Sequence, residues 1–339
     1  MKKPIKTALS FLLITAFLAG AVSCAPRETK HSISWFDYFD TVITLTVYTE
    51  DRAVFDEMNK KTRECFERYH KLFDIYNEYD ELVNLATVNR MAGEEIETDE
   101  EIVKLLELGK EYERLTEGAL NIAMGAVLGL WHDARETALN DPENAYVPDA
   151  DALKAASEHC NIEKLALNAE KKTVQLLDSE MRIDVGAIAK GYAADRAAEM
   201  LKGYGKPFLL NCGGAVLASG KKPDGTSFTA GILDPKGEGF VDTVEVSDAA
   251  LSTSGSYIRT FSVGGREYGH IIDPDTLMPA EKLLSISVKL PIQAGACFAD
   301  ALSTACFILG AERAEAVIGS IPGAECVAVD IIGGIRHIG

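Results

Sequence analysis

Short segments of strand-like composition follow one another closely through the second half of the chain, and they limit the folds that it can adopt. The strands predicted there cover 227–233, 241–246, 257–263, 266–272 and 283–290. Gly264-Gly265, between two of these strands, is a two-residue hairpin signal. Connections this short join antiparallel strands. The sequence therefore predicts a mainly antiparallel sheet.

Helical spacing of apolar residues interrupts this pattern. Helices are predicted over 51–76, 99–115, 149–160, 188–205 and 294–310, and further strands over 41–48, 164–168, 173–177, 181–185 and 207–214. The stretch 116–131 is apolar but interrupted by glycines, which is typical of a cavity wall or of a buried helix, and the polar stretch 132–150 predicts a surface excursion. No repeat or clear linker divides the chain. We therefore predict a single large α+β domain, with a mostly antiparallel sheet core flanked by helices.

The first residues have the pattern of an export signal. Three lysines precede an uncharged run from Thr7 to Ser23, whose apolar centre is too short for a comfortable membrane span. The run ends in AVSC, and small residues before Cys24 fit a bacterial lipoprotein signal; an ordinary signal peptide with a coincidental cysteine is the alternative. We predict a signal peptide over 1–23, lipid on Cys24 that anchors the protein to a membrane surface, a polar tether over 24–34, and a folded domain over 35–339.

Charge and cysteine content exclude other classes. The formal net charge is −18, and removal of residues 1–23 with their three lysines makes it more negative still, so nucleic acid is a poor partner. The other six cysteines form no CxxC pair, and most lie in apolar surroundings. Buried free thiols are therefore expected, in preference to disulfides or a zinc site.

The segment DVGAIAKGYAAD (184–195) contains two glycines with the spacing of a phosphate-binding loop. Such a loop needs Lys and Ser or Thr after its second glycine, whereas Tyr192 follows here, so a nucleoside-triphosphate site of that type is excluded. The segment reads as the end of a strand that turns into a helix. The free amide groups of that turn could hold an anion, and a plain strand-to-helix connection is the alternative.

The segment ADALSTA places Asp300 and Thr304 four residues apart, on one face of an apolar helix. A carboxylate and a hydroxyl in apolar surroundings need a partner. Their oxygens suit a hard cation such as Mg²⁺, which keeps waters and bridges phosphates; a structural cap or ion pair is the alternative for Asp300.

Three further stretches carry polar groups whose role is open when each is taken alone. GHIIDPDTLMP (269–279) holds His270 at a predicted strand end, LSTSGSY (251–257) reads as a hydroxyl-rich turn, and LLNCGG (209–214) allows close approach to its backbone. Each could face an anion or serve the fold.

Taken together and in this order, DVGAIAKGYAAD, LNCGG, STSGSY, HIIDP and ADALSTA resemble the ApbE family of flavin transferases. The resemblance covers residues 35 to 320 and implies a T-fold-like α+β domain. It also implies an exported or lipid-anchored bacterial enzyme that moves FMN from FAD onto a protein threonine or serine and releases AMP.

The resemblance further implies site residues. Lys190 is the expected FAD contact, with Asp184 nearby, and the backbone carbonyl of Ala187 would join Asp300 and Thr304 as Mg²⁺ ligands. The remaining expected flavin contacts are Phe39, Tyr76, Ala119, Leu120, Asn121, Thr253, Ser254, Gly255 and Ile271, with Tyr79 as a competitor for Tyr76. Two positions depart from the family pattern: Phe39-Asp40-Thr41 replaces Met-Gly-Thr, and Leu120-Asn121 replaces Phe-Asp.

We expect a metal-assisted phosphoryl transfer to a hydroxyl of the acceptor protein. His270 is the expected base, because an imidazole with its ordinary pKa of about 6.5 accepts a proton at neutral pH, and Asp300 could share that task. Membrane redox-pump subunits or an exported flavoprotein are the expected acceptors, on the outer face of the cell membrane. The alternatives are an Mg²⁺-dependent FAD pyrophosphatase and a non-catalytic FAD-binding lipoprotein.

Overall fold

The computed structural model describes residues 28–257 and 259–339. The predicted signal peptide over 1–23 and the predicted lipid site at Cys24 lie outside the described residues. Within the described ranges, no helix combines the length and the apolar character that a membrane span requires.

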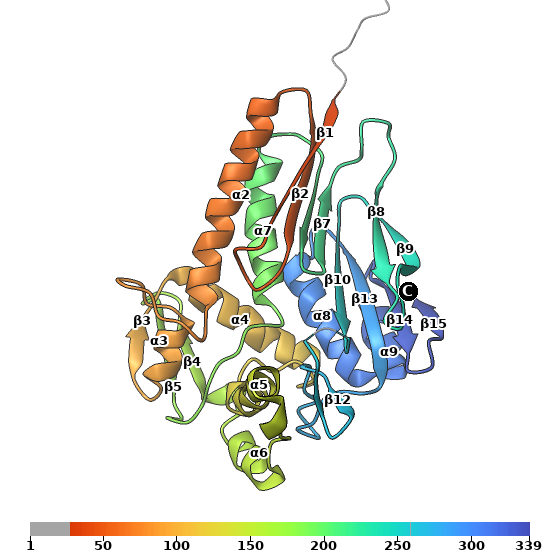
Figure 1. Ribbon diagram of the computed structural model, residues 1–339. Helices are drawn as coiled ribbons and strands as arrows, with labels where there is room; N and C mark the ends of the chain where they lie inside the picture. The colour runs from red at the N-terminus through yellow and green to blue at the C-terminus, as the bar shows by residue number, and fades with distance from the viewer. Residues whose placement is uncertain (1–27, 258) are drawn as a thin grey trace, which may run out of the picture.

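An eight-stranded antiparallel sheet forms the centre of the molecule (Figure 1). Its strands, in spatial order, are β1 (Thr29–Trp35), β2 (Ile43–Thr49), β6 (Phe208–Cys212), β7 (Ala215–Ser219), β10 (Ala249–Gly255), β13 (Leu283–Pro291), β14 (Glu325–Asp330) and β15 (Ile335–Ile338). Alternate residues such as Ile43, Leu45 and Val47 are fully buried on one face of this sheet. The predicted α+β fold with a mostly antiparallel sheet is therefore confirmed.

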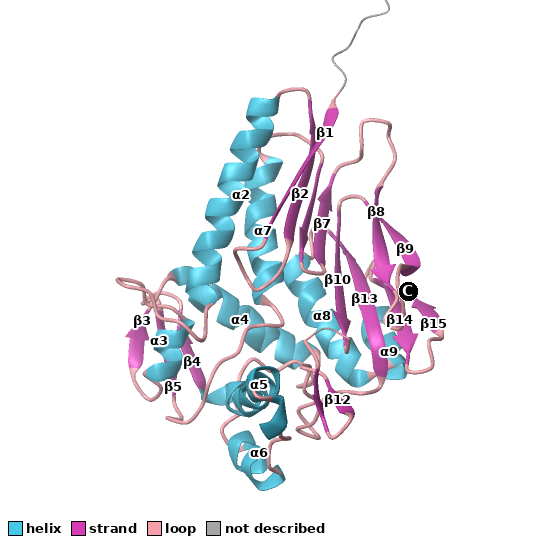
Figure 2. Cartoon of the chain, viewed as in Figure 1, coloured by secondary structure: helices cyan, strands magenta, loops and turns pink. Residues whose placement is uncertain are grey.

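Helices cover that buried face. They are α2 (Arg52–Phe73), α7 (Ala189–Lys202), α8 (Ala296–Leu309) and α9 (Ala311–Gly319), and α7 packs between α2 and α8 (Figures 1 and 2). Helix α4 (Glu100–Leu115) contacts α8. Nearly every residue of α8 is buried, as expected for a helix that is apolar all round. Asp195 of α7 and Asp300 of α8 are thus carried by two neighbouring helices.

Smaller elements surround the sheet. They are α3 (Leu85–Arg90), α5 (Gly125–Asn140), α6 (Ala150–Ser157), the three-stranded sheet of β3 (Glu95–Glu97), β5 (Thr173–Leu176) and β4 (Leu165–Asn168), the hairpin of β8 (Phe228–Leu233) and β9 (Phe240–Val246), and the hairpin of β11 (Phe261–Val263) and β12 (Arg266–Tyr268). Val263 pairs with Arg266, so the turn predicted at Gly264-Gly265 is confirmed. The β8–β9 hairpin packs on the face of the main sheet opposite to the helices, through Phe228, Val246 and Leu251.

Three boundaries differ from the sequence prediction because polar side chains conceal two strands and the second half of one helix. The hydroxyl-rich stretch predicted as a turn at 251–257 is mostly strand β10, which lies between β7 and β13. The tether predicted up to residue 34 extends too far, because Thr29–Trp35 forms β1 and Ser32 and Ser34 hydrogen-bond to Thr46 and Thr44 of β2. The surface excursion predicted from residue 132 begins later, because α5 continues to Asn140.

The strand predicted at 181–185 is not formed. The Asn89 side chain hydrogen-bonds both backbone groups of Ile183. Its Oδ1 atom accepts from the Ile183 amide at 2.7 Å, and its Nδ2 atom donates to the Ile183 carbonyl at 2.9 Å. The next amide, that of Asp184, donates to the Ile122 carbonyl at 2.8 Å. These bonds satisfy the backbone as a neighbouring strand would, so the segment stays extended without belonging to a sheet.

Helices α7 and α8 meet in a contact that only glycine allows. A Cβ atom on Gly191 would lie 2.4 Å from the Ala296 carbonyl oxygen. Four residues later, the Asp195 carboxylate accepts hydrogen bonds from the amides of Ala296 (2.7 Å) and Cys297 (2.9 Å), and so caps α8, which lacks a side-chain cap of its own.

We predict that Gly191→Ala lowers the free energy of unfolding by about 1–3 kcal/mol, because the clash is with rigid backbone and exceeds the gain of ~1 kcal/mol in helix propensity. Gly129→Ala, at an open position of α5 where nothing lies within 4 Å of the new Cβ, is the matched control and should gain stability. Urea unfolding of the two variants measures both changes. Equal stabilisation by the two substitutions would contradict the close contact.

Candidate functional site

One cavity of about 760 Å³ opens beside the main sheet, where α5, α7, α8 and the loops around β11 and β12 meet. Its lining includes fourteen of the fifteen residues predicted for the site: Tyr76, Ala119, Leu120, Asn121, Asp184, Ala187, Lys190, Thr253, Ser254, Gly255, His270, Ile271, Asp300 and Thr304. Segments that lie far apart in the sequence are therefore brought to one place.

Phe39 is the predicted residue that does not line this cavity. Its ring packs edge-on against Phe66 and His70 of α2, and its amide donates to His70 Nδ1. Phe39 and Asp40 both have positive φ angles, of 56° and 48°, so the chain turns sharply and presents Asp40 and Thr41 to the cavity. The structure does not support Phe39 as a flavin contact.

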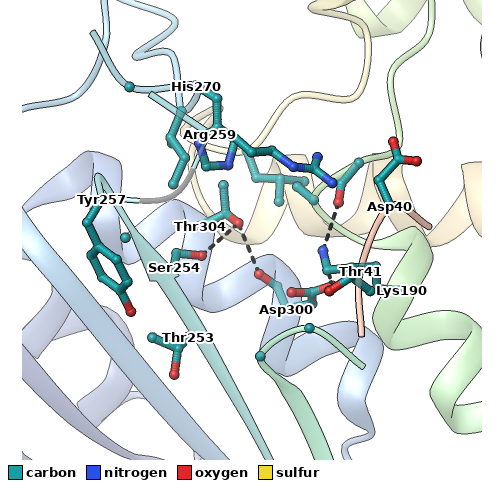
Figure 3. Close-up of a pocket in the computed structure, with 18 of the residues that line it drawn as sticks. Asp40, Thr41, Lys190, Thr253, Ser254, Tyr257, Arg259, His270, Asp300 and Thr304 are labelled. Carbon is teal, nitrogen blue, oxygen red and sulfur yellow. Dashed lines mark hydrogen bonds and ion pairs between the residues drawn. The ribbon is translucent and has the colours of Figure 1, made fainter. Parts of the chain in front are cut away.

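Asp300 is the centre of the polar network (Figure 3). Its Oδ2 atom accepts from the Gly191 amide at 3.2 Å and lies 3.3 Å from Lys190 Nζ, and its Oδ1 atom accepts from the Ser252 hydroxyl at 2.8 Å. Asp300 is only 4% exposed, and a buried carboxylate needs such partners. Lys190 also donates to the Gly186 carbonyl at 3.2 Å, so its ammonium group bridges the Asp300 carboxylate and the turn that precedes α7.

The start of α7 leaves the Ala187 carbonyl available. In a regular helix the Gly191 amide would donate to this carbonyl, but here it donates to Asp300 instead. Among the described residues, no donor is placed on the Ala187 carbonyl oxygen, and α7 begins only at Ala189. The predicted third oxygen ligand is therefore unengaged at the edge of the cavity.

Strand β10 supplies hydroxyl groups to α8. Because side chains alternate along a strand, Ser252 and Ser254 both face the helix. Ser254 Oγ lies 3.2 Å from Thr304 Oγ1, and Thr304 Oγ1 donates to the Asp300 carbonyl at 3.2 Å (Figure 3). Thr253 points to the other face of the sheet, where its hydroxyl contacts Ser287 at 2.7 Å.

Asp184 also lines the cavity and is half-buried. Its Oδ1 atom accepts from the Gly186 amide at 2.8 Å. Burial of the carboxyl group raises the pKa of Asp184 above its ordinary value, and the opposing effects of that hydrogen bond and of the positive charges at His132, Arg259 and Lys190 are smaller. A carboxyl group with a raised pKa in a cavity is typical of a functional site.

Tyr76 rather than Tyr79 faces the cavity. The Tyr76 ring stacks on His132 with ring centres 4.6 Å apart and is 61% exposed, whereas the Tyr79 hydroxyl donates to Asp74 at 2.8 Å. Asn121 is held by the fold, because its side chain bonds the Cys160 carbonyl and the Ala123 amide. The stretch 116–124 is therefore a turn that forms a cavity wall, and α5 follows it.

Several lining residues were not predicted. Arg259 follows β10 and extends across the site toward Asp40 (Figure 3). Gly213, with a φ of 61°, approaches Thr41 so closely that a Cβ atom would lie 1.9 Å from the Thr41 hydroxyl oxygen. The LNCGG motif pointed to this close approach, but a lone arginine after STSGSY carried no signal of its own.

Within the described residues, no three His, Cys, Asp or Glu side chains gather as a metal site would require. The donors at Asp300, Thr304 and Ala187 are of another kind: one carboxylate, one hydroxyl and one backbone carbonyl. Hard oxygen donors of this kind suit Mg²⁺, which completes its shell with water and phosphate oxygens.

Comparison with known proteins gives a consistent result. The model of the ApbE family matches residues 39–328. An FAD:protein FMN transferase from Treponema pallidum is 31% identical over 336 residues, which cover 94% of this chain and 90% of the relative. One from Haemophilus influenzae is 29% identical over 324 residues, covering 89% and 87%. The crystal structure of the ApbE protein from Thermotoga maritima is 27% identical and superposes with a TM-score of 0.81, covering 91% of this chain and 97% of that one. The chain belongs to the ApbE family.

Proposed function

We propose that this protein is an FAD:protein FMN transferase, which moves FMN from FAD onto a serine or threonine hydroxyl of an acceptor protein and releases AMP. The observation that carries the proposal is the grouping of Asp300, Lys190, Thr304 and the unengaged Ala187 carbonyl in one cavity. The names of the relatives from Treponema pallidum and Haemophilus influenzae support the same reaction.

We also propose that the site works with Mg²⁺. The carboxylate of Asp300, the hydroxyl of Thr304 and the carbonyl of Ala187 would hold it. When bound, Mg²⁺ would neutralise negative charge on the pyrophosphate of FAD. The fit rests on the chemistry of the donors and on the Ala187 carbonyl, whose helical partner is diverted to Asp300.

The protein's own groups would act around the pyrophosphate. The ammonium group of Lys190 and the guanidinium group of Arg259 both face the cavity and would stabilise the charge that develops on the phosphate oxygens. The aromatic ring of Tyr76 and the wall of Ala119 and Leu120 would hold the flavin end of the substrate.

The transfer step would form one bond and break another. The acceptor hydroxyl oxygen attacks the phosphorus atom of the FMN half, the bond from that phosphorus to the bridging oxygen breaks, and AMP leaves with that oxygen. The hydroxyl proton passes to His270, which lines the cavity. Water in place of the acceptor hydroxyl would give FAD hydrolysis to FMN and AMP at the same centre, so the two activities differ only in the nucleophile.

The location remains a proposal from the sequence. Residues 1–23 have the export pattern, and Cys24 follows small residues as in lipoproteins. We propose a lipid-anchored protein on the outer face of the cell membrane, where membrane redox-pump subunits or exported flavoproteins would be the acceptors.

We predict that Asp300→Asn lowers the transfer rate at least ~100-fold, because it removes the charge that faces Lys190 and the proposed cation. Asparagine keeps the shape and can still accept from Ser252, so the fold should be retained. Transfer is measured as covalent flavin fluorescence on the acceptor at saturating Mg²⁺ and FAD. A melting temperature near that of the wild type is the control, and activity within tenfold of the wild type would contradict the assignment.

Asp184 generates a prediction on pH. Because its pKa is raised in the folded state, its contribution to stability is present below the unfolded pKa and is lost as the pH rises through the folded pKa. We therefore expect Asp184→Asn, without FAD, to be more stable than the wild type at pH 7, and the difference to shrink as the pH falls toward 4. Urea unfolding at both pH values measures this. A variant that is less stable at pH 7 would show that the carboxylate is not strained by burial.

A further inference from the structure

The cavity has a second arm, along the open face of the main sheet. Register places Thr44, Asn211, Val216 and Leu251 side by side on β2, β6, β7 and β10, and all four line the cavity. The β8–β9 hairpin forms the wall of this arm through Thr229, Gly231, Leu233 and Phe240, and Thr253 and Gly214 lie where the arm meets the polar centre. We call these residues the sheet arm.

We infer that the sheet arm receives an extended, uncharged segment of the acceptor protein, whose serine or threonine thereby reaches the phosphorus atom. This inference rests on the proposed transferase function and identifies where its protein substrate lies. The polar centre is recessed between α7 and α8, so an acceptor hydroxyl must arrive on a segment narrow enough to enter the cavity.

The lining of the sheet arm suits a polypeptide. Among the described residues that line it, none carries a charge, whereas Lys190, Arg259, Asp184 and Asp300 all lie at the other end. The Asn211 Oδ1 atom accepts from the Gly214 amide at 3.2 Å, and its Nδ2 atom donates to no group in the described part of the chain. That amide can therefore donate to a peptide carbonyl, and Thr229, which also lines the cavity, is exposed.

The β8–β9 hairpin carries large apolar side chains that the fold leaves exposed. Phe240 is 65% exposed and Leu233 is 48% exposed, although both line the cavity. The Phe240 ring packs against Gly231, where a Cβ atom would lie 2.3 Å from the ring atom Cδ1. An exposed aromatic side chain held in place beside a cavity is typical of a residue that anchors a partner protein.

FAD is a less suitable occupant of this arm. Of the predicted flavin contacts only Thr253 belongs to the sheet arm, whereas Tyr76, Leu120 and Asn121 line the cavity outside it, on the side of α5. The pyrophosphate carries negative charge and would remain at Lys190 and Arg259. With the flavin beside α5 and the pyrophosphate at Lys190 and Arg259, the sheet arm adjoins the phosphorus atom.

The test uses the purified full-length protein, FAD, Mg²⁺ and the flavin-free form of a flavin-carrying membrane redox-pump subunit as acceptor. Phe240→Ala is expected to raise the KM for this acceptor about tenfold, while kcat at saturating acceptor and the Kd for FAD change less than twofold. Leu233→Ala should give a smaller shift in the same direction and provides a second readout if Phe240→Ala does not fold. Leu177→Ala is the matched control: Leu177 is 57% exposed but lies outside the cavity, and no constant should change.

The outcomes separate this inference from the proposed function. An unchanged KM for the acceptor in both hairpin variants overturns the inference while wild-type transfer stands. A weakened Kd for FAD with an unchanged KM for the acceptor also overturns it, and assigns Phe240 to the dinucleotide. No transfer by the wild type, despite FAD binding, overturns the proposed function and this inference with it.

Discussion

The contact between the first turn of α7 and α8 determines the geometry of the site. Gly191 allows the two helices to touch, and Asp195 caps α8 from α7. The same contact lets the Gly191 amide reach Asp300, which frees the Ala187 carbonyl. The carboxylate, the carbonyl and the Lys190 ammonium group are therefore positioned by a single interface. A shift of one helix against the other would disturb all three, which explains why these residues occupy rigid elements.

The elements that could be predicted from the sequence are those with a local signal. Asp99 caps α4 where the prediction started that helix, and the glycine pair joins β11 to β12. Strand β10 was missed because its inward residues are serines, whose partners lie on α8, about fifty positions later. The stretch 181–185 was misassigned for a related reason. Its alternation is real, but the side chain of Asn89 takes the place of a neighbouring strand. No local pattern shows which distant group forms the hydrogen bonds of a backbone segment.

The site residues, like the elements of the fold, were predicted where the sequence carries a local signal. Motifs resembling a known family identified the residues that touch the polar centre, and the structure places nearly all of them in one cavity. Phe39 does not line the cavity, because the turn at Phe39-Asp40 has left-handed backbone at both positions and presents Asp40 to the cavity instead. Of the sheet arm, the sequence pointed only to Thr253 and to the LNCGG motif, and the wall formed by the β8–β9 hairpin was not predicted. Phe240 is one of thirteen phenylalanines, and its exposure follows only from how the hairpin packs on the sheet.

The division of the cavity also bears on the choice between transfer and hydrolysis. In the proposed mechanism both reactions use one charged centre, so that centre cannot by itself select the nucleophile. Water is present at about 55 M in bulk, and a protein hydroxyl competes with it only when held close to the phosphorus atom in a productive orientation. A segment filling the uncharged arm would provide that orientation and exclude water from the same space. On this view Lys190, Asp300 and Thr304 supply the chemistry, whereas Asn211, Leu233 and Phe240 decide which molecule receives the flavin.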